Sequence, residues 1–132
     1  MREFHLKIAT PDGLVFDGNA EGMLVRTSGG DVEIMAGHED YFAILGTGRA
    51  KLTAGGSARV AASSGGFISV KGGECSMVAT TFEFADEIDL DRARRAKANA
   101  EEAIRRAESD KALAIAKAKL LRAISRINAA EE

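Results

Sequence analysis

Residues 88–132 read IDLDRARRAKANAEEAIRRAESDKALAIAKAKLLRAISRINAAEE, a segment that contains neither Gly nor Pro. All 14 glycines of the chain lie earlier, between Gly13 and Gly73. Alanine is the best helix former, whereas glycine adopts turn conformations at little steric cost. This break in composition predicts two units, a β-sandwich domain over residues 1–86 and a helical domain over residues 87–132.

Small and apolar residues recur in the helical segment at alternating spacings of three and four. Asp89 is a favourable N-cap, and Ser109-Asp110 interrupts the pattern where a second helix can begin. The recurring positions are 93, 96, 100, 103 and 107, and then 113, 116, 120, 123 and 127. Two such stripes predict an antiparallel two-helix hairpin. Burial of apolar surface stabilises a protein by about 0.8 kcal/mol per CH₂ group, and the alanine side chain is a single methyl group. We therefore expect the two helices to be held only weakly, both to each other and to the sandwich.

Short apolar segments separated by turn residues occupy the rest of the chain. Residues 4–8, FHLKI, alternate apolar and polar side chains, as a strand with one buried face does. The following TPDG is typical of a tight turn. The candidate strands are residues 4–8, 14–16, 23–27, 32–35, 41–45, 49–53, 58–63, 67–70, 75–80 and 81–84. This pattern predicts an antiparallel β-sandwich or barrel of about ten short strands, and hence an α+β chain with a C-terminal hairpin.

Charge and hydropathy limit the classes of partner. The net charge is −2, so the sequence gives no reason to expect nucleic acid binding. Residues 88–132 carry 11 basic and 8 acidic residues, so the hairpin is mildly basic on an acidic body. It either meets an acidic surface or has a solvated surface of mixed charge. No uncharged stretch approaches the ~20 residues that span a bilayer and no N-terminal signal is visible, so we expect a soluble chain without direct membrane insertion.

Side chains suited to catalysis or metal binding are few. Cys75 is the single cysteine and lies in an apolar stretch, where a buried thiol is expected. His5 and His38 are the two histidines, too few for a zinc cluster. His38-Glu39-Asp40 combines an imidazole with carboxylates, but neighbouring loop residues splay apart and no nucleophile accompanies them. The sequence therefore predicts no catalytic residue and no metal site.

Three arginines form the remaining pattern of interest. Arg92 lies one turn into the first predicted helix, and Arg122 and Arg126 share one face of the second. In an antiparallel hairpin these guanidinium groups can converge near a helix N-terminus, which is the arrangement that binds phosphate. They can equally be exposed charges of a helical hairpin.

Four segments, taken in order, resemble the epsilon subunit of bacterial F-type ATP synthases. They are residues 6–18 (LKIATPDGLVFDG), 30–38 (GDVEIMAGH), 64–70 (SGGFISV) and 88–93 (IDLDRA). Two residues depart from the family pattern: Glu33 replaces the usual glycine and Ala36 the usual proline. The loop around them can therefore differ in shape.

The resemblance implies a non-catalytic rotor subunit of the central stalk, attached peripherally to the cytoplasmic face of the bacterial cell membrane. Its partners would be the gamma subunit, the c-ring and the catalytic alpha and beta subunits. By resemblance, the ring-contacting loop comprises Ser28, Gly29, Gly30, Asp31, Val32 and Glu33. The gamma-facing residues are Thr10, His38 and Ala43.

The resemblance also implies a regulatory hairpin, which alternates between a compact form and an extended form that inhibits ATP hydrolysis. The positions implied for inhibitory contacts are Arg94, Arg95, Arg105 and Arg106. Some family members bind ATP in the compact form, and the matching positions here are Glu83, Ile88, Asp89, Arg92, Ala93, Arg122 and Arg126. Asn99 stands where those members tend to carry arginine, so any regulatory ATP is expected to bind weakly, and no other cofactor is implied.

Two other classes of function compete with this interpretation. One is a stand-alone interaction module whose helical hairpin inserts into a soluble partner complex. The other is a small sandwich enzyme that uses His38 and nearby carboxylates, which the absence of a nucleophile disfavours. The partner that co-purifies with the chain would separate these hypotheses.

Overall fold

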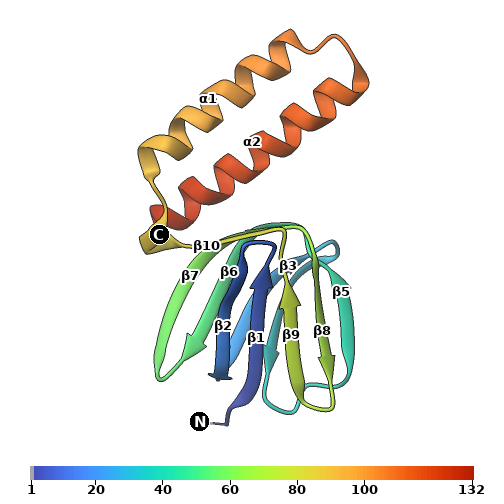
Figure 1. The fold of residues 1–132 in the computed structure, drawn as a ribbon, viewed down its shortest axis with the longest axis vertical. Coiled ribbons are helices and arrows are strands. Elements are labelled where there is room, and N and C mark those ends of the chain that lie inside the picture. Colours follow the sequence, from blue (N-terminus) through green and yellow to red (C-terminus); the bar gives the residue numbers. More distant parts are fainter. Residues whose placement is uncertain (1) are drawn as a thin grey trace.

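The computed structural model describes residues 2–132 and contains ten strands, a short 3₁₀ turn and two α-helices (Figure 1). The strands are β1 (Phe4–Thr10), β2 (Gly13–Ala20), β3 (Gly22–Thr27), β4 (Gly30–Met35), β5 (Tyr41–Ile44), β6 (Thr47–Ala54), β7 (Ser57–Ser64), β8 (Phe67–Lys71), β9 (Glu74–Val78) and β10 (Thr81–Phe84). They are followed by η1 (Ala85–Glu87), α1 (Leu90–Arg106) and α2 (Asp110–Ala130). The predicted fold class is confirmed.

The strands form two five-stranded sheets. Their orders are β2-β1-β9-β8-β5 in sheet A and β10-β7-β6-β3-β4 in sheet B. The prediction of a wholly antiparallel sandwich is wrong at one pair, because β1 and β9 run parallel, with Leu6 opposite Cys75. These strands are far apart in sequence, so no tight hairpin fixes their relative direction.

Alternating side chains of both sheets build one core between them. In β1, Phe4, Leu6 and Ile8 are buried while His5 and Lys7 are exposed. The buried hydrophobic cluster contains residues of the strands and of their connections, and none of the helices. The sandwich therefore has a hydrophobic core of its own, and the hairpin adds nothing to it.

Gly66 shows why one predicted turn requires glycine. Its φ is +90°, and a Cβ atom there would lie 1.8 Å from the carbonyl oxygen of Val78. The chain passes so close to β9 at the start of β8 that a side chain cannot fit. The Gly65-Gly66 pair is thus fixed by both backbone conformation and space.

The two helices form the predicted antiparallel hairpin. Asp89 caps α1 by accepting a hydrogen bond from the backbone N–H of Arg92, and Ser109 caps α2 by accepting one from Ala112. Both predicted caps are confirmed. The fully buried helix residues are all alanines: Ala93, Ala100, Ala116, Ala123 and Ala129.

One predicted seam position is wrong. Ala103 is exposed, whereas the adjacent Ile104 is half-buried. A strict three-four spacing drifts by about 20° per heptad relative to a straight helix, so the buried stripe moves by one residue near the end of α1.

The hairpin rests on sheet B through α2, which contacts β6, β7 and η1 (Figure 1). Ion pairs join the two units at Glu83–Arg126 and Arg49–Glu132. The predicted domain boundary after residue 86 falls inside η1, where the chain leaves β10 and turns into α1. Neither helix in residues 2–132 has the combination of length and apolar character needed to cross a membrane.

Candidate functional site

A cavity of about 440 Å³ lies where β10, the start of α1 and the end of α2 meet. β10 supplies Glu83, the turn at η1 brings the chain to the Asp89 cap, and the antiparallel return of α2 brings Arg126 back to the same place. Six of the seven residues predicted for nucleotide binding share this cavity. The full lining is Glu83, Glu87, Ile88, Asp89, Arg92, Ala93, Ala96 and Arg126.

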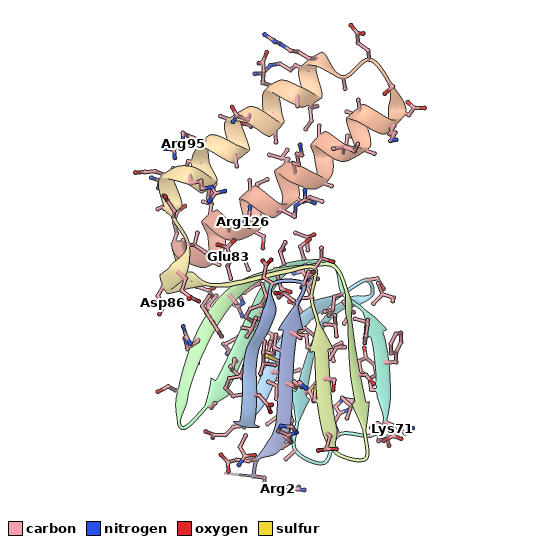
Figure 2. All side chains as sticks on the ribbon, in the orientation of Figure 1. Arg2, Lys71, Glu83, Asp86, Arg95 and Arg126 are labelled. Atoms are coloured by element: carbon pink, nitrogen blue, oxygen red, sulfur yellow. The ribbon has the colours of Figure 1, made fainter. Side chains whose placement is uncertain are left out.

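An ion pair orders the side of this cavity that faces the sandwich. Arg126 Nε donates to Glu83 Oε1 at 2.6 Å, and both side chains are partly buried (Figure 2). The Asp89 carboxylate is engaged with the backbone at the start of α1. The cavity thus presents carboxylates and guanidinium groups together, which can hydrogen-bond a ligand with both polar and anionic parts.

Arg122, the seventh predicted residue, lies outside this cavity. It lines an adjoining groove of about 310 Å³ between the helices, together with Ala96, Asn99, Ala100, Ala103, Lys119 and Arg126. Ala96 and Arg126 line both spaces, so the cavity and the groove adjoin. Arg92 and Arg126 therefore share one cavity, whereas Arg122 lies in the adjoining groove.

Lys119 was not among the predicted residues. It precedes Arg122 by three positions and Arg126 by seven, which places all three on one face of α2. The sequence shows that spacing. It does not show which residues of α1 face this side of α2, because that depends on how the two helices are paired.

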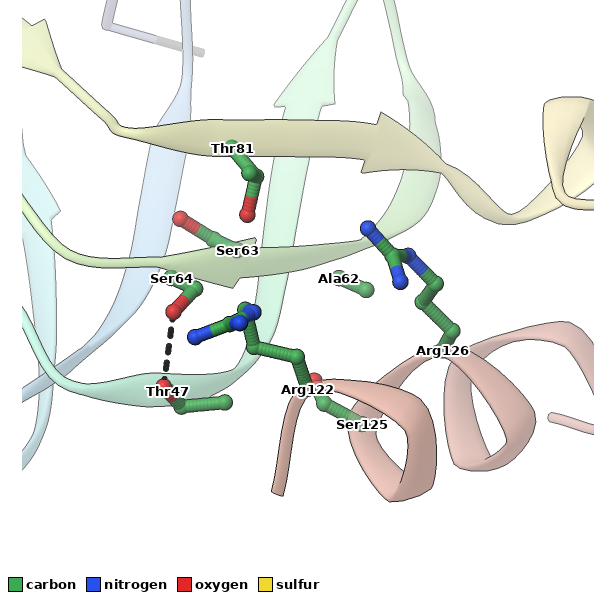
Figure 3. A pocket seen from close by; sticks show the side chains of 8 residues that line it. All are labelled: Thr47, Ala62, Ser63, Ser64, Thr81, Arg122, Ser125 and Arg126. Atoms are coloured by element: carbon green, nitrogen blue, oxygen red, sulfur yellow. Dashed lines mark hydrogen bonds between the residues drawn. The ribbon is translucent and has the colours of Figure 1, made fainter. Parts of the chain in front are cut away.

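On its other side, Arg122 faces sheet B. Figure 3 shows a small pocket lined by Arg122, Arg126 and several hydroxyl-bearing residues, among which Thr47 and Ser64 are hydrogen-bonded at 2.8 Å. The volume of this pocket is about 10 Å³. It has room for no more than a water-sized group, so this pocket cannot hold a nucleotide.

The predicted ring-contacting residues form the β3–β4 turn and most of β4. Asp31 is exposed and accepts a hydrogen bond from Arg26 Nε at 2.5 Å, which lowers the pKa of its carboxyl group. Asp31 also lines a groove shared with Arg49 and Glu132. This loop therefore lies beside the docked end of α2.

The three residues predicted to face gamma do not form one site. Thr10 ends β1, Ala43 lies in β5, and His38 lies in the loop that precedes β5. Strands β9 and β8 separate β1 from β5 in sheet A. Ala43 packs against the core, and its neighbours Phe42 and Ile44 carry the exposed apolar side chains of this strand.

The arginines predicted for inhibitory contacts are all exposed on α1. Arg94 and Arg95 lie in its first turns, and the side chain of Arg95 points into solvent (Figure 2). Arg105 and Arg106 lie in its last turn, where both pair with Glu102 and lower the pKa of its carboxyl group. The two pairs therefore present positive charge near opposite ends of the helix.

The side chains considered for catalysis have structural partners. Burial raises the pKa of the Cys75 thiol to about 11, as expected for a core residue. His38 Nδ1 is 2.8 Å from the backbone oxygen of Glu39, and Asp40 accepts a hydrogen bond from the Gly72 N–H. Within the described residues, no three His, Cys, Asp or Glu side chains form a group suited to a metal ion.

Comparisons with known proteins cover almost the whole chain. Residues 3–85 match the family described as the ATP synthase delta/epsilon chain, beta-sandwich domain, and residues 86–131 match its long alpha-helix domain. The chain is 37% identical to the ATP synthase epsilon chain of Ruminococcus albus, with 100% of this chain and 99% of the relative covered. It is also 37% identical to that of Bacillus pumilus, with 98% of each covered.

Solved structures share the fold at low sequence identity. A chain of the Euglena gracilis mitochondrial ATP synthase (OSCP/F1/c-ring) superposes with a TM-score of 0.84 at 20% identity, covering 98% of this chain and 82% of that one. A chain of the Tetrahymena thermophila mitochondrial ATP synthase central stalk and c-ring gives a TM-score of 0.67 at 15% identity, covering 98% and 97%.

Proposed function

The chain belongs to the ATP synthase delta/epsilon chain family, and from this we propose that it is a non-catalytic central-stalk subunit that couples gamma to the c-ring. The observation that carries this proposal is the match of both domains, in order, over nearly the full length of bacterial epsilon chains. The proposed location is the cytoplasmic face of the bacterial membrane, reached through these partners.

Co-purification tests the proposed assembly. We expect the full-length tagged chain, isolated from detergent extracts of membranes, to carry gamma and the c-ring with it. A variant with Asp31→Cys should cross-link to the ring, because the proposed ring contact includes the exposed Asp31. Recovery of a soluble complex without gamma would contradict the proposed assembly. Cross-links from position 31 to gamma alone would contradict the proposed contact with the ring.

We further propose that the hairpin restrains ATP hydrolysis by extending toward the alpha and beta subunits. Two partly exposed ion pairs link the end of the hairpin to the sandwich, Glu83–Arg126 and Arg49–Glu132, each contributing about 0.2–1 kcal/mol. An arm held this weakly can leave sheet B without unfolding the core, and its exposed arginines suit an acidic surface.

The regulatory role is tested by removing residues 88–132 from the assembled complex. We expect faster ATP hydrolysis with ion pumping retained, because the proposed gamma and ring contacts all lie in the sandwich. An Arg94→Gln/Arg95→Gln variant of the full chain should show a smaller increase of the same kind. Unchanged hydrolysis in the truncated complex would exclude an inhibitory hairpin.

We propose that the compact hairpin can also bind ATP weakly, in the cavity bounded by Glu83, Asp89, Arg92 and Arg126. The support is the juxtaposition of six of the predicted residues around one space of about 440 Å³. Bound nucleotide would stabilise the compact form, because the cavity is built from both helices and β10.

A further inference from the structure

We propose that the small pocket between α2 and sheet B binds one water molecule, which joins the hydroxyl group of Ser125 to the hydroxyl pair of Thr47 and Ser64. The hairpin would then dock on the sandwich through a hydrated polar contact. This inference depends neither on nucleotide binding nor on inhibition of hydrolysis, because it concerns only how the docked hairpin is held.

The first observation is a shielded hydroxyl group on α2. The Oγ atom of Ser125 is buried, and no hydrogen-bond partner for it lies within residues 2–132. Ser125 lines the pocket together with residues of three strands (Figure 3). A buried hydroxyl group without a hydrogen bond destabilises a fold, and most such groups in native proteins are paired with protein atoms or ordered water. Ser125 therefore requires a partner that the surrounding side chains do not supply.

The sandwich side of the pocket carries hydroxyl groups that can bond a further partner. Thr47 begins β6 and Ser64 ends β7, the two residues are register partners, and their side-chain oxygens are 2.8 Å apart. One hydroxyl group of the pair donates to the other, which leaves one donor and several lone pairs. Thr81, the register partner of Ser64 on β10, also lines the pocket. The end of sheet B thus brings three hydroxyl-bearing residues to the pocket that Ser125 lines.

The size and the chemistry of the pocket suit water. Its volume of about 10 Å³ is at the lower bound of the space that one water molecule needs. A buried water molecule makes about three hydrogen bonds, and it both donates and accepts, as hydroxyl groups do. Arg122 also lines the pocket and supplies guanidinium N–H donors. The pocket therefore offers enough polar partners on both of its walls.

A hydrated contact has a consequence for the proposed movement of the hairpin. When α2 leaves sheet B, the hydroxyl groups of the pocket can hydrogen-bond to solvent, and the bound water molecule is released. Separation at this point therefore exposes mainly polar groups. A dry contact between large apolar side chains would instead oppose separation in proportion to the apolar area exposed.

A high-resolution crystal structure of the full chain tests the site directly. We expect one density peak in the pocket, within hydrogen-bonding distance of Ser125 Oγ and of the Thr47 or Ser64 hydroxyl oxygen. Crystals grown with bromide in place of chloride are the control, because bromide gives an anomalous signal and water does not. An anomalous peak in the pocket would identify a monatomic anion and overturn the proposal. A pocket without density, with the Ser125 hydroxyl donating to the carbonyl oxygen of Leu121, would also overturn it.

A double-mutant cycle tests the same link in solution. Ser125→Ala and Ser64→Ala each remove one hydroxyl group from the pocket, and no direct hydrogen bond joins these two side chains. Helical circular dichroism during urea unfolding would give the unfolding equilibrium constant of each variant. If one water molecule joins both residues, the fold-change in the double variant should be smaller than the product of the single fold-changes by about twofold or more.

The matched control combines Ser125→Ala with Ser76→Ala, an exposed substitution on β9. This second cycle should give the plain product, because Ser76 lies outside the pocket. The effect of alanine on helix propensity is the same in both backgrounds of each cycle and therefore cancels. Plain products in both cycles would show that Ser125 and Ser64 are not linked, and would overturn the proposal.

Discussion

Single residues decide how the hairpin meets the sandwich. Glu83 at the edge strand β10 holds Arg126, and Arg49 on β6 holds Glu132 at the end of α2. Asn99, which weakens the expected ATP site by removing a cation, lies in the same groove as Lys119. The positive charge that Asn99 lacks on α1 is present in this groove on Lys119 of α2. Only the pairing of the two helices reveals that these residues share a groove.

His5 provides a prediction at this scale that depends on pH. Its Nε2 is 2.6 Å from Asp17, and this hydrogen bond raises the pKa of the imidazole above its usual 6.5, with Glu74 at 3.4 Å adding to the effect. Protonated His5 therefore stabilises the fold below the unfolded pKa near 6.5, and this contribution is lost as pH rises through the folded pKa.

We expect His5→Gln to be less stable than the unchanged chain at pH 5.5 and nearly equal to it at pH 8.5. Urea denaturation at the two pH values measures this difference. A matched variant, Lys7→Gln, removes a neighbouring charge from the same exposed face of β1 and should show no such pH dependence. A stability deficit of His5→Gln that is the same at both pH values would contradict the ion-pair explanation.

At the scale of elements, each helix is delimited by a capping side chain and packed through alanine. The caps satisfy backbone N–H groups that the helix itself leaves without partners. The alanine seam permits close approach of α1 and α2 but buries little area, so the caps contribute a large share of what keeps the hairpin regular. The strands differ, because their larger side chains fill a common core.

Ser109→Ala tests the contribution of a cap. Loss of the hydrogen bond to the Ala112 N–H should cost about 1 kcal/mol and lower amide protection in the first turns of α2. Hydrogen exchange measured by residue would show the change confined to the hairpin. Ser76→Ala, an exposed substitution on β9, is the control and should leave protection of α2 unchanged. Equal protection in both variants would show that packing alone maintains α2.

At the scale of the whole molecule, the chain is a sandwich with its own core that carries a hairpin outside that core. The core cluster lies within residues 4–84, whereas the C-terminal end of α2 rests against one end of sheet B, where it contacts β6 and β7 (Figure 1). Because no helix residue belongs to the core of the sandwich, movement of the hairpin would not require that core to unfold, which is the property that a regulatory arm requires.

Truncation to residues 1–87 tests this independence. We expect a folded, cooperative β-sandwich, because no helix residue belongs to its core. Fluorescence of Tyr41, which packs against that core, should report the same urea midpoint in the truncated and full-length chains. In the full-length chain, helical circular dichroism should disappear at lower urea than the Tyr41 signal. A truncated chain without a cooperative transition would show that the hairpin is part of the folding unit.

The sequence alone determined the elements and their order, because these follow from local chemistry. Glycine spacing placed the strands, Asp89 and Ser109 placed the helix starts, and the alanine stripes indicated the hairpin. What only the tertiary structure decided are relations between distant segments: the parallel pairing of β1 with β9, the exposure of Ala103, the separation of Thr10 from His38 by two intervening strands, and the shared groove of Arg122 and Lys119. Such relations depend on how whole faces pack, and no local pattern specifies them.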